Sequence, residues 1–523
     1  MSEPGGGRDV GETLSRARIE RRFLANSGLI IAARAVTAVL SLATIPVLVS
    51  RLGVAGYGTW EALLALASLT SMFQAAVSGT LVWRVSESYG RGDMAEIRRL
   101  ARLGAGASWA MFVLLWPLAW FLREPAVHFL GVSPETRPLV SAMFPVVAAF
   151  ILLGGFSETL EAVVSGCQRT GLVNVVTAFG QILNYSVVIV LILFGGGLWS
   201  LVAGLATGFA GRFAGAWVAT RVAYGSISLV PLVPRRTDLS MARYSGLLTV
   251  GSVAAALRDQ TDKIVLASLA SPAWVGYYGI ASRLSGLVME IIRFFYLPIL
   301  TAVGALNAMG DWDGVRRLYG RLMATVSIVT GVVVIVVAGL ADRLVVLWIG
   351  HPIPQVTLLI WLLITGSATA ATLTGPGTAI CRGCGRAGIE TTYLAFNLVL
   401  NVVLTVSLVL LIGPIGTAVA TGLTWALSSI LFLFVLHRRL DLPVEASRRA
   451  GGAAFVAAAV AVGVYWASRL LGLPVGRYDA FVSVVLLGAA GGLLYLGLLV
   501  SCRLVRVDEA YGGIRALVRR AGS

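Results

Sequence analysis

Four charged residues interrupt an apolar segment between residues 257 and 265. The stretch "LRDQTDKIV" contains Arg258, Asp259, Asp262 and Lys263, and the residues on both sides of it are almost entirely apolar. A charge at the centre of a membrane-spanning helix costs about 2.5–3.5 kcal/mol to insert. Arg258–Asp262 and Asp259–Lys263 are each four positions apart, so on a helix every charge has an opposite partner one turn away. The spacing predicts two ion pairs on a helix face that meets protein or water rather than lipid.

Other charges lie in two further apolar segments. Arg283, Glu290 and Arg293 fall within residues 275–299, and Arg34 lies in the first apolar segment without an acid nearby. The combined charge is positive, and the planar fork of arginine binds phosphate oxygens in a bidentate way. We expect five basic residues to bind an anionic head group: Arg34, Arg258, Lys263, Arg283 and Arg293. We expect three acids to act as counter-ions or as proton or cation sites: Asp259, Asp262 and Glu290. The alternative is that these residues are structural salt bridges between helices.

The composition defines the class of protein that holds these charges. The 523-residue chain is 57% hydrophobic and 13% charged, whereas soluble domains are about 25% charged. Fourteen apolar runs are long enough to cross a bilayer as helices. They cover about 24–49, 58–83, 103–122, 138–162, 172–194, 198–220, 245–270, 275–299, 321–340, 356–379, 389–412, 415–436, 451–471 and 479–501. The sequence therefore predicts an all-α integral membrane protein with about 14 transmembrane helices, whose function lies in the helices and short loops.

The placement of the basic residues predicts the orientation. The net charge is +16, and most basic residues fall in the two terminal segments and in every second loop, as the positive-inside rule requires of cytoplasmic segments. We expect both termini to be cytoplasmic and the protein to lie in the cytoplasmic (inner or plasma) membrane. This distribution argues against a nucleic-acid partner. The first 23 residues lack the apolar core of a signal peptide.

The chain contains an internal repeat. "GDMAEIRRL" from Gly92 recurs as "GDWDGVRRL" from Gly310, and "GCQRTG" from Gly166 recurs as "GCGRAG" from Gly383, each about 218 residues later. "GYG" at 56–58 and "YYG" at 277–279 match at a slightly longer offset, which indicates a small length change between the copies. Six helices per copy give parallel repeats, and transporters with such halves bind substrate between them and rock one half against the other.

The repeat sets the predicted domain boundaries. We expect a cytoplasmic segment at 1–23, an N-lobe at 24–222, a linker at 223–244, a C-lobe at 245–437, two extra helices within 438–502, and a cytoplasmic tail at 503–523.

Two motifs that suggest metal chemistry are discounted by the repeat. Cys381 and Cys384 form a CxxC, but Cys381 corresponds to Val164 in the first copy. Asp311 begins a DxD, but the feature shared with the first copy is one Asp before a basic helical turn, which is typical of a helix N-cap. The sequence predicts no metal site and no cofactor.

Four more charged residues lie near the ends of apolar runs. Glu61 is close to the outer end of the second run, and Glu158 and Glu161 are close to the cytoplasmic end of the fourth. We expect interfacial exposure for these two glutamates, and we expect Arg212 to extend toward the cytoplasm.

Several longer stretches resemble one transporter superfamily. They are "RLGVAGYGTW", "VGYYGIASRLSGL", "GDWDGVRRLYGRL" and "GTAICRGCGRAGIETTYLAFNLVLNVVLTVSLVLLIGPIGTAVAT". Over about residues 24–440 the chain resembles the multidrug/oligosaccharidyl-lipid/polysaccharide (MOP) flippase superfamily, and within it the Wzx-type polysaccharide branch. The resemblance implies two six-helix lobes around a central cavity. It also implies a flippase that moves a polyprenyl-diphosphate-linked oligosaccharide to the outer leaflet for cell-surface polysaccharide synthesis, with the basic residues named above contacting the diphosphate.

Two rival functions stay open. An ion-coupled multidrug antiporter of the same superfamily would need an acidic, aromatic cavity, against which the basic surplus argues. A membrane polymerase or ligase acting on lipid-linked sugars would need a large outer loop, and the longest outer loops here are short. We therefore expect a non-enzymatic transporter that acts as a monomer with membrane lipids and a proton or sodium gradient as its other partners.

Overall fold

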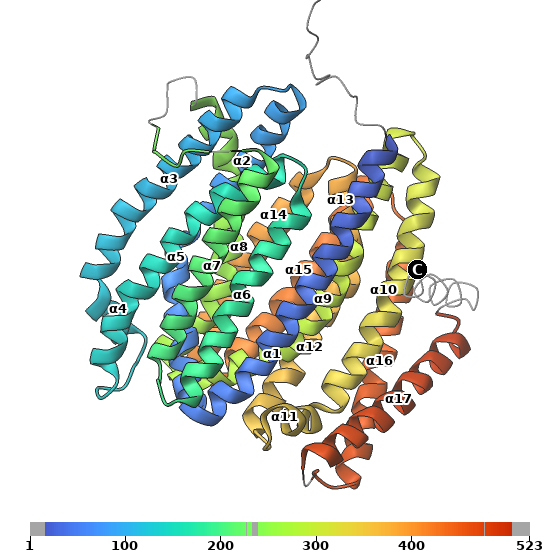
Figure 1. The fold of residues 1–523 in the computed structure, drawn as a ribbon. Coiled ribbons are helices and arrows are strands. Elements are labelled where there is room, and N and C mark those ends of the chain that lie inside the picture. Colours follow the sequence, from blue (N-terminus) through green and yellow to red (C-terminus); the bar gives the residue numbers. More distant parts are fainter. Residues whose placement is uncertain (1–15, 226, 233–238, 475, 505–523) are drawn as a thin grey trace, which may run out of the picture.

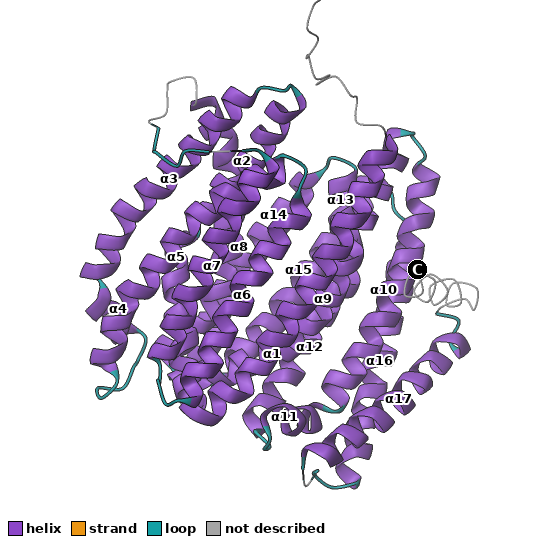
Figure 2. Ribbon diagram, viewed as in Figure 1, coloured by secondary structure: helices purple, strands orange, loops and turns teal. Residues whose placement is uncertain are grey.

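The computed structural model describes residues 16–225, 227–232, 239–474 and 476–504, and these residues form helices and short connections without a strand (Figure 2). The α-helices are α1 (Arg16–Ser68), α2 (Gln74–Gly90), α3 (Met94–Phe121), α4 (Arg123–Phe129), α5 (Arg137–Gly166), α6 (Thr170–Leu193), α7 (Trp199–Ala223), α8 (Leu239–Leu269), α9 (Pro272–Ala308), α10 (Trp312–Gly339), α11 (Ala341–Ile349), α12 (Pro354–Leu373), α13 (Gly375–Gly383), α14 (Ala387–Ile412), α15 (Ile415–Leu440), α16 (Val444–Leu470) and α17 (Arg477–Ser501). They form one elongated bundle (Figure 1).

Length and hydropathy support a multi-pass membrane protein. Within the described residues, 11 helical segments are long and apolar enough to cross a bilayer. The all-α prediction is confirmed, whereas the count of fourteen crossings stays a prediction. The first two apolar runs share α1, which bends at Gly53 (φ 70°, ψ 169°), and a short 3₁₀ turn at Leu69–Ser71 separates α1 from α2.

The helix boundaries repeat in the register of the sequence repeat. The first copy runs through α3, a short α4 and α5, and the second runs through α10, a short α11 and the α12–α13 pair. Asp93 and Asp311 cap the equivalent helices α3 and α10, where their carboxylates accept hydrogen bonds from the backbone N–H of Glu96 (2.9 Å) and Gly314 (2.7 Å). The N-cap prediction is confirmed, and the DxD is explained by helix capping.

A reciprocal backbone contact corrects one detail of the repeat. A Cβ on Gly58 would lie 1.8 Å from the carbonyl oxygen of Pro272, and a Cβ on Gly276 would lie 2.3 Å from that of Val54. Val54 and Pro272 each begin a helical stretch, and each glycine lies four residues further on. The equivalent residues are therefore Gly58 and Gly276, and the tyrosine match that suggested a length change was wrong, because packing rather than letter identity fixes the register.

The helices beyond the repeat form one edge of the bundle. α16 and α17 pack against each other and against α10 and α11 (Figure 1). Arg343 on α11 joins them, because its guanidinium is buried and donates to the hydroxyl of Ser483 (2.6 Å) and to the carbonyls of Ser468 and Gly472 (both 2.7 Å). These contacts satisfy carbonyl groups at the C-terminal end of α16 and tie α11 to a side chain of α17, so we assign Arg343 a structural role.

Candidate functional site

The charges of 257–265 lie on α8, but they do not pair as the spacing predicted. The Lys263 Nζ donates to Glu61 Oε2 at 2.6 Å, and the Arg258 guanidinium pairs with its neighbour Asp259 (2.7 Å) and stacks over the Trp425 ring. The predicted i,i+4 pairs Arg258–Asp262 and Asp259–Lys263 are wrong. Lys263 and Asp262 take their partners from neighbouring helices, whereas Arg258 pairs within α8.

Glu61 anchors a polar cluster between α1, α8 and α9. Its Oε1 accepts a hydrogen bond from the buried Tyr57 hydroxyl at 2.9 Å, and its Oε2 accepts from Lys263. Glu61 interacts electrostatically with Arg283 on α9 as well. Glu61 is 6% exposed, so its charge is compensated by groups from three helices rather than by solvent. Glu61 was not predicted as a site residue, because no residue near it in the sequence indicates a partner on α8.

A cavity of about 140 Å³ lies beside this cluster. Its lining comes from α1, α6, α7 and α9 and includes polar and aromatic side chains: Ser41, Thr44, Tyr57, Trp60, Glu61, Asn184, Tyr185 and Arg283. The Arg283 side chain is exposed and, among the described residues, forms no ion pair. With Lys263 bound to Glu61, Arg283 gives the cavity wall one surplus positive charge.

Asp262, the residue before Lys263 on α8, lies in a cage of neutral polar groups. Its Oδ1 accepts hydrogen bonds from Asn401 (3.4 Å) and Thr405 (3.2 Å), and its Oδ2 accepts from Thr421 (2.8 Å) and from the Tyr278 hydroxyl. Asp262 is 6% exposed. Four donors from α9, α14 and α15 surround one carboxylate that has no cationic partner in the described chain.

Two further oxygen atoms near this cage are buried without hydrogen-bond partners. They are Oδ1 of Asn401 and Oγ1 of Thr417. A carboxylate, an amide oxygen and hydroxyls are the ligands that hard cations prefer, and a proton would also neutralise the buried charge. One signal for this cage is visible in the sequence, because "AFNLVLN" places Asn401 in the middle of an apolar helix.

The helix-end charges of the first copy are more buried than predicted. Arg212 is paired, because its Nε and Nη2 donate to the two carboxylate oxygens of Glu161, both at 2.7 Å. Glu161 is 8% exposed, so interfacial exposure was wrong for this residue. Burial of Glu161 favours the pairing, since an unpaired buried charge is costly.

The remaining predicted site residues are exposed or have side chains outside the described residues. The side chains of Arg34 on α1 and Arg293 on α9 lie outside the described residues, so their roles stay predictions. Glu290 and Asp259 are exposed.

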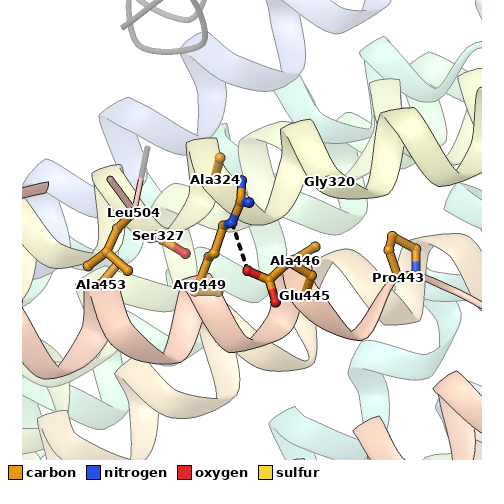
Figure 3. A pocket seen from close by; sticks show the side chains of 10 residues that line it. Gly320, Ala324, Ser327, Pro443, Glu445, Ala446, Arg449, Ala453 and Leu504 are labelled. Atoms are coloured by element: carbon orange, nitrogen blue, oxygen red, sulfur yellow. Dashed lines mark hydrogen bonds and ion pairs between the residues drawn. The ribbon is translucent and has the colours of Figure 1, made fainter. Parts of the chain in front are cut away.

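A larger cavity, of about 210 Å³, lies between α10 and α16 (Figure 3). Most of its lining is small and apolar, and its charged groups are Arg449 and Glu445, which pair at 3.1 Å on α16. It contains none of the central charges, so we do not assign the functional site to it.

The chain shares its fold, a bundle of helices built from two repeats, with solved membrane transporters, one of which is titled as a member of the MOP superfamily. The MatE family matches residues 30–190. The solved lipid II flippase MurJ, in an inward closed conformation, superposes with a TM-score of 0.72 over 91% of this chain and 100% of that one, at 12% identity.

Other similar proteins are named as MATE transporters or as multidrug resistance proteins. An inward-facing multidrug resistance MATE family transporter of the MOP superfamily superposes with a TM-score of 0.67 over 79% of this chain and 98% of that one, at 12% identity. The Vibrio cholerae MATE transporter VcmN in its bent form gives 0.56 over 81% and 98%, at 13% identity. The probable multidrug resistance protein NorM of Rhizobium meliloti (strain 1021) is 30% identical over 121 residues, which span 23% of this chain and 26% of that protein.

Proposed function

We propose that this chain is an ion-coupled flippase for a polyprenyl-diphosphate-linked oligosaccharide, of the Wzx-like type, that works by alternating access in the cytoplasmic membrane. The observation that carries the proposal is the positive surplus at the cavity wall, where Arg283 is exposed beside the Glu61–Lys263 pair. A guanidinium binds a diphosphate through paired N–H donors. The superposition with a lipid II flippase over the whole of its length supports the proposal.

The coupling ion in this proposal binds at Asp262. Its cage combines one carboxylate with oxygen atoms that have no partner, and it suits a proton or sodium. Asp262→Asn should abolish the dependence of transport on the ion gradient while downhill substrate movement continues. Uphill transport that is unchanged in Asp262→Asn would exclude this site.

The test of the substrate is flipping of a fluorescent polyprenyl-diphosphate oligosaccharide in proteoliposomes. Arg283→Ala should lower the flipping rate about ten- to a hundredfold, because a charged hydrogen bond is worth about 1.5–3 kcal/mol. Arg449→Ala is the matched control, since it removes an arginine from the other cavity (Figure 3). Equal rates in the two variants would remove Arg283 from the substrate site.

The second candidate function is a multidrug antiporter. Glu61 and the aromatic side chains of Tyr57, Trp60 and Tyr185 in the cavity wall favour it, as does the partial match to a protein named as a multidrug resistance protein. Gradient-driven uptake of a cationic dye by the same proteoliposomes, lost in Glu61→Gln and without any flipping of the lipid-linked probe, would establish this function instead.

A further inference from the structure

A second group of buried charges lies in the first repeat, away from the central cavity. Glu158 and Glu161 are three positions apart on α5, and both oxygens of Glu161 are engaged by Arg212. One guanidinium neutralises one carboxylate, so the group retains one negative charge at Glu158. Among the described residues, the hydrogen bond to Glu158 comes from a neutral donor, the Ser78 hydroxyl on α2, at 3.1 Å.

The surroundings of Glu158 contain an unsatisfied acceptor. Gln74 lies one turn before Ser78 on α2 and is 3% exposed. Its amide nitrogen donates to the Leu152 carbonyl at 2.8 Å, but its Oε1 is buried and has no partner. Gln74 and Ser78 line a small cavity between α2, α3 and α5 together with Ser108 and Thr159. A buried acceptor without a partner costs about 1–3 kcal/mol, so a hydrogen-bond donor beside Gln74 would be favoured.

The second repeat carries no such charges. In the register of the repeat, Glu158 and Glu161 correspond to Gly375 and Thr378, and Arg212 corresponds to Ser429. The equivalent helices α12, α13 and α15 pack together with neutral residues at these positions. The charges of the first copy are therefore not needed to build this part of the fold, and a role in binding is the better explanation for their cost.

We propose that Glu158 is a proton-binding site of the N-lobe, separate from the Asp262 cage. One proton passes from water to a carboxylate oxygen of Glu158, which becomes neutral, and it leaves by the reverse step. The charged groups that face Glu158 are Arg212 from α7 and Glu161 on α5 itself. In the described residues, α2 and α3 contribute the neutral hydroxyls of Ser78 and Ser108 to this region.

Protonation would act on the contact between the lobes. The ionised carboxylate accepts the Ser78 hydrogen bond and ties α2 to α5, and α2 also packs against α8 of the second repeat. α2, α3, α5 and α7 lie side by side in the bundle (Figure 1). Proton binding weakens the Ser78 link, so it biases the position of α2 against α8.

The experiment is infrared difference spectroscopy on the full-length protein in lipid, with the buffer changed from about pH 8 to about pH 5. Carboxyl groups whose pKa is raised by burial change their protonation state in this range. We expect a carbonyl band from a protonated carboxylic acid that Glu158→Gln removes and that Glu87→Gln keeps. Glu87 is the matched control, because it lies on α2 in pairs with Arg84 and Arg91. No transport is measured, so the result is independent of whether the substrate proposal holds.

Two more variants test the assignment to Glu158. Glu161→Gln frees Arg212 for Glu158, so the band should appear only at a pH lower by about one to three units, the usual effect of an adjacent arginine. Ser78→Ala removes a donor to the ionised form, so the band should appear at higher pH. A band that survives in Glu158→Gln, or that responds to sodium at constant pH instead of to protons, would overturn the proposal.

Discussion

The Glu61–Lys263 pair allows a quantitative prediction about how the two repeats are held together. The two side chains are 8% and 20% exposed and their charged atoms are 2.6 Å apart. Removing one member leaves the other charge buried, which costs about 3–5 kcal/mol. Lys263→Met leaves the buried Glu61 carboxylate with Arg283 as a remaining cationic neighbour. We therefore expect a cost at the lower end of this range, about 3 kcal/mol, or roughly a hundredfold change in the folding equilibrium.

A double-mutant cycle measures the interaction energy between Glu61 and Lys263 separately from their contacts with other residues. Glu61→Gln combined with Lys263→Met should recover stability to within about 1 kcal/mol of the natural chain, because no buried charge is left unpaired. The measurement is the free energy of unfolding of the full-length protein in detergent micelles, followed by circular dichroism through a denaturant titration.

The matched control is the pair on α16 beside the larger cavity. Glu445 and Arg449 are 60% and 41% exposed, so the same cycle with Glu445→Gln and Arg449→Met should give a coupling energy of less than about 1 kcal/mol. Equal coupling energies in the two cycles, or no loss of stability in Lys263→Met, would refute the view that the central ion pair stabilises the contact between the repeats.

Three further predictions follow from local geometry. Gly276→Ala should separate the repeats and lower the melting temperature, because the new Cβ would lie 2.3 Å from the carbonyl oxygen of Val54. The control Gly286→Ala on the same helix should be tolerated, because its Cβ would meet nothing within 4 Å. Asp311→Ala should reduce unfolding free energy by about 1 kcal/mol through loss of the α10 cap; a change within error would mean that the cap is redundant. Burial raises the pKa of the Cys167 thiol to about 11, so the rate at which maleimide labels Cys167 should be low at neutral pH and rise with pH. The exposed Cys502 should react first. Equal labelling rates at neutral pH would show that Cys167 is accessible as a thiolate.

The sequence allowed the elements to be predicted well because their signals are local. Apolar runs marked the helices, and an Asp before a basic turn marked the start of α3 and of α10. The repeat was visible because the loops between helices kept their glycines and arginines. These features depend on residues close together in the chain.

The site was only partly predictable, because its partners are distant in sequence. The spacing of Asp259 and Lys263 allowed an ion pair, but in the folded bundle Lys263 binds Glu61 on another helix. The cage of Asp262 is built from hydroxyls on α14 and α15, and threonines in apolar helices give no signal of which helix they face. Spacing along one helix identifies candidate partners, whereas packing between helices selects among them.

The glycine contact between the repeats also has a meaning for the history of the chain. Gly58 packs on the carbonyl of Pro272 while Gly276 packs on that of Val54, so each copy offers the other the same surface. Such a contact is isologous, the kind that forms twice about the axis of a symmetric dimer. A separate six-helix ancestor would have met a second copy of itself through this surface. The fusion of two such subunits then freed each to diverge, and a charge pair such as Glu161–Arg212 has a place in one copy only.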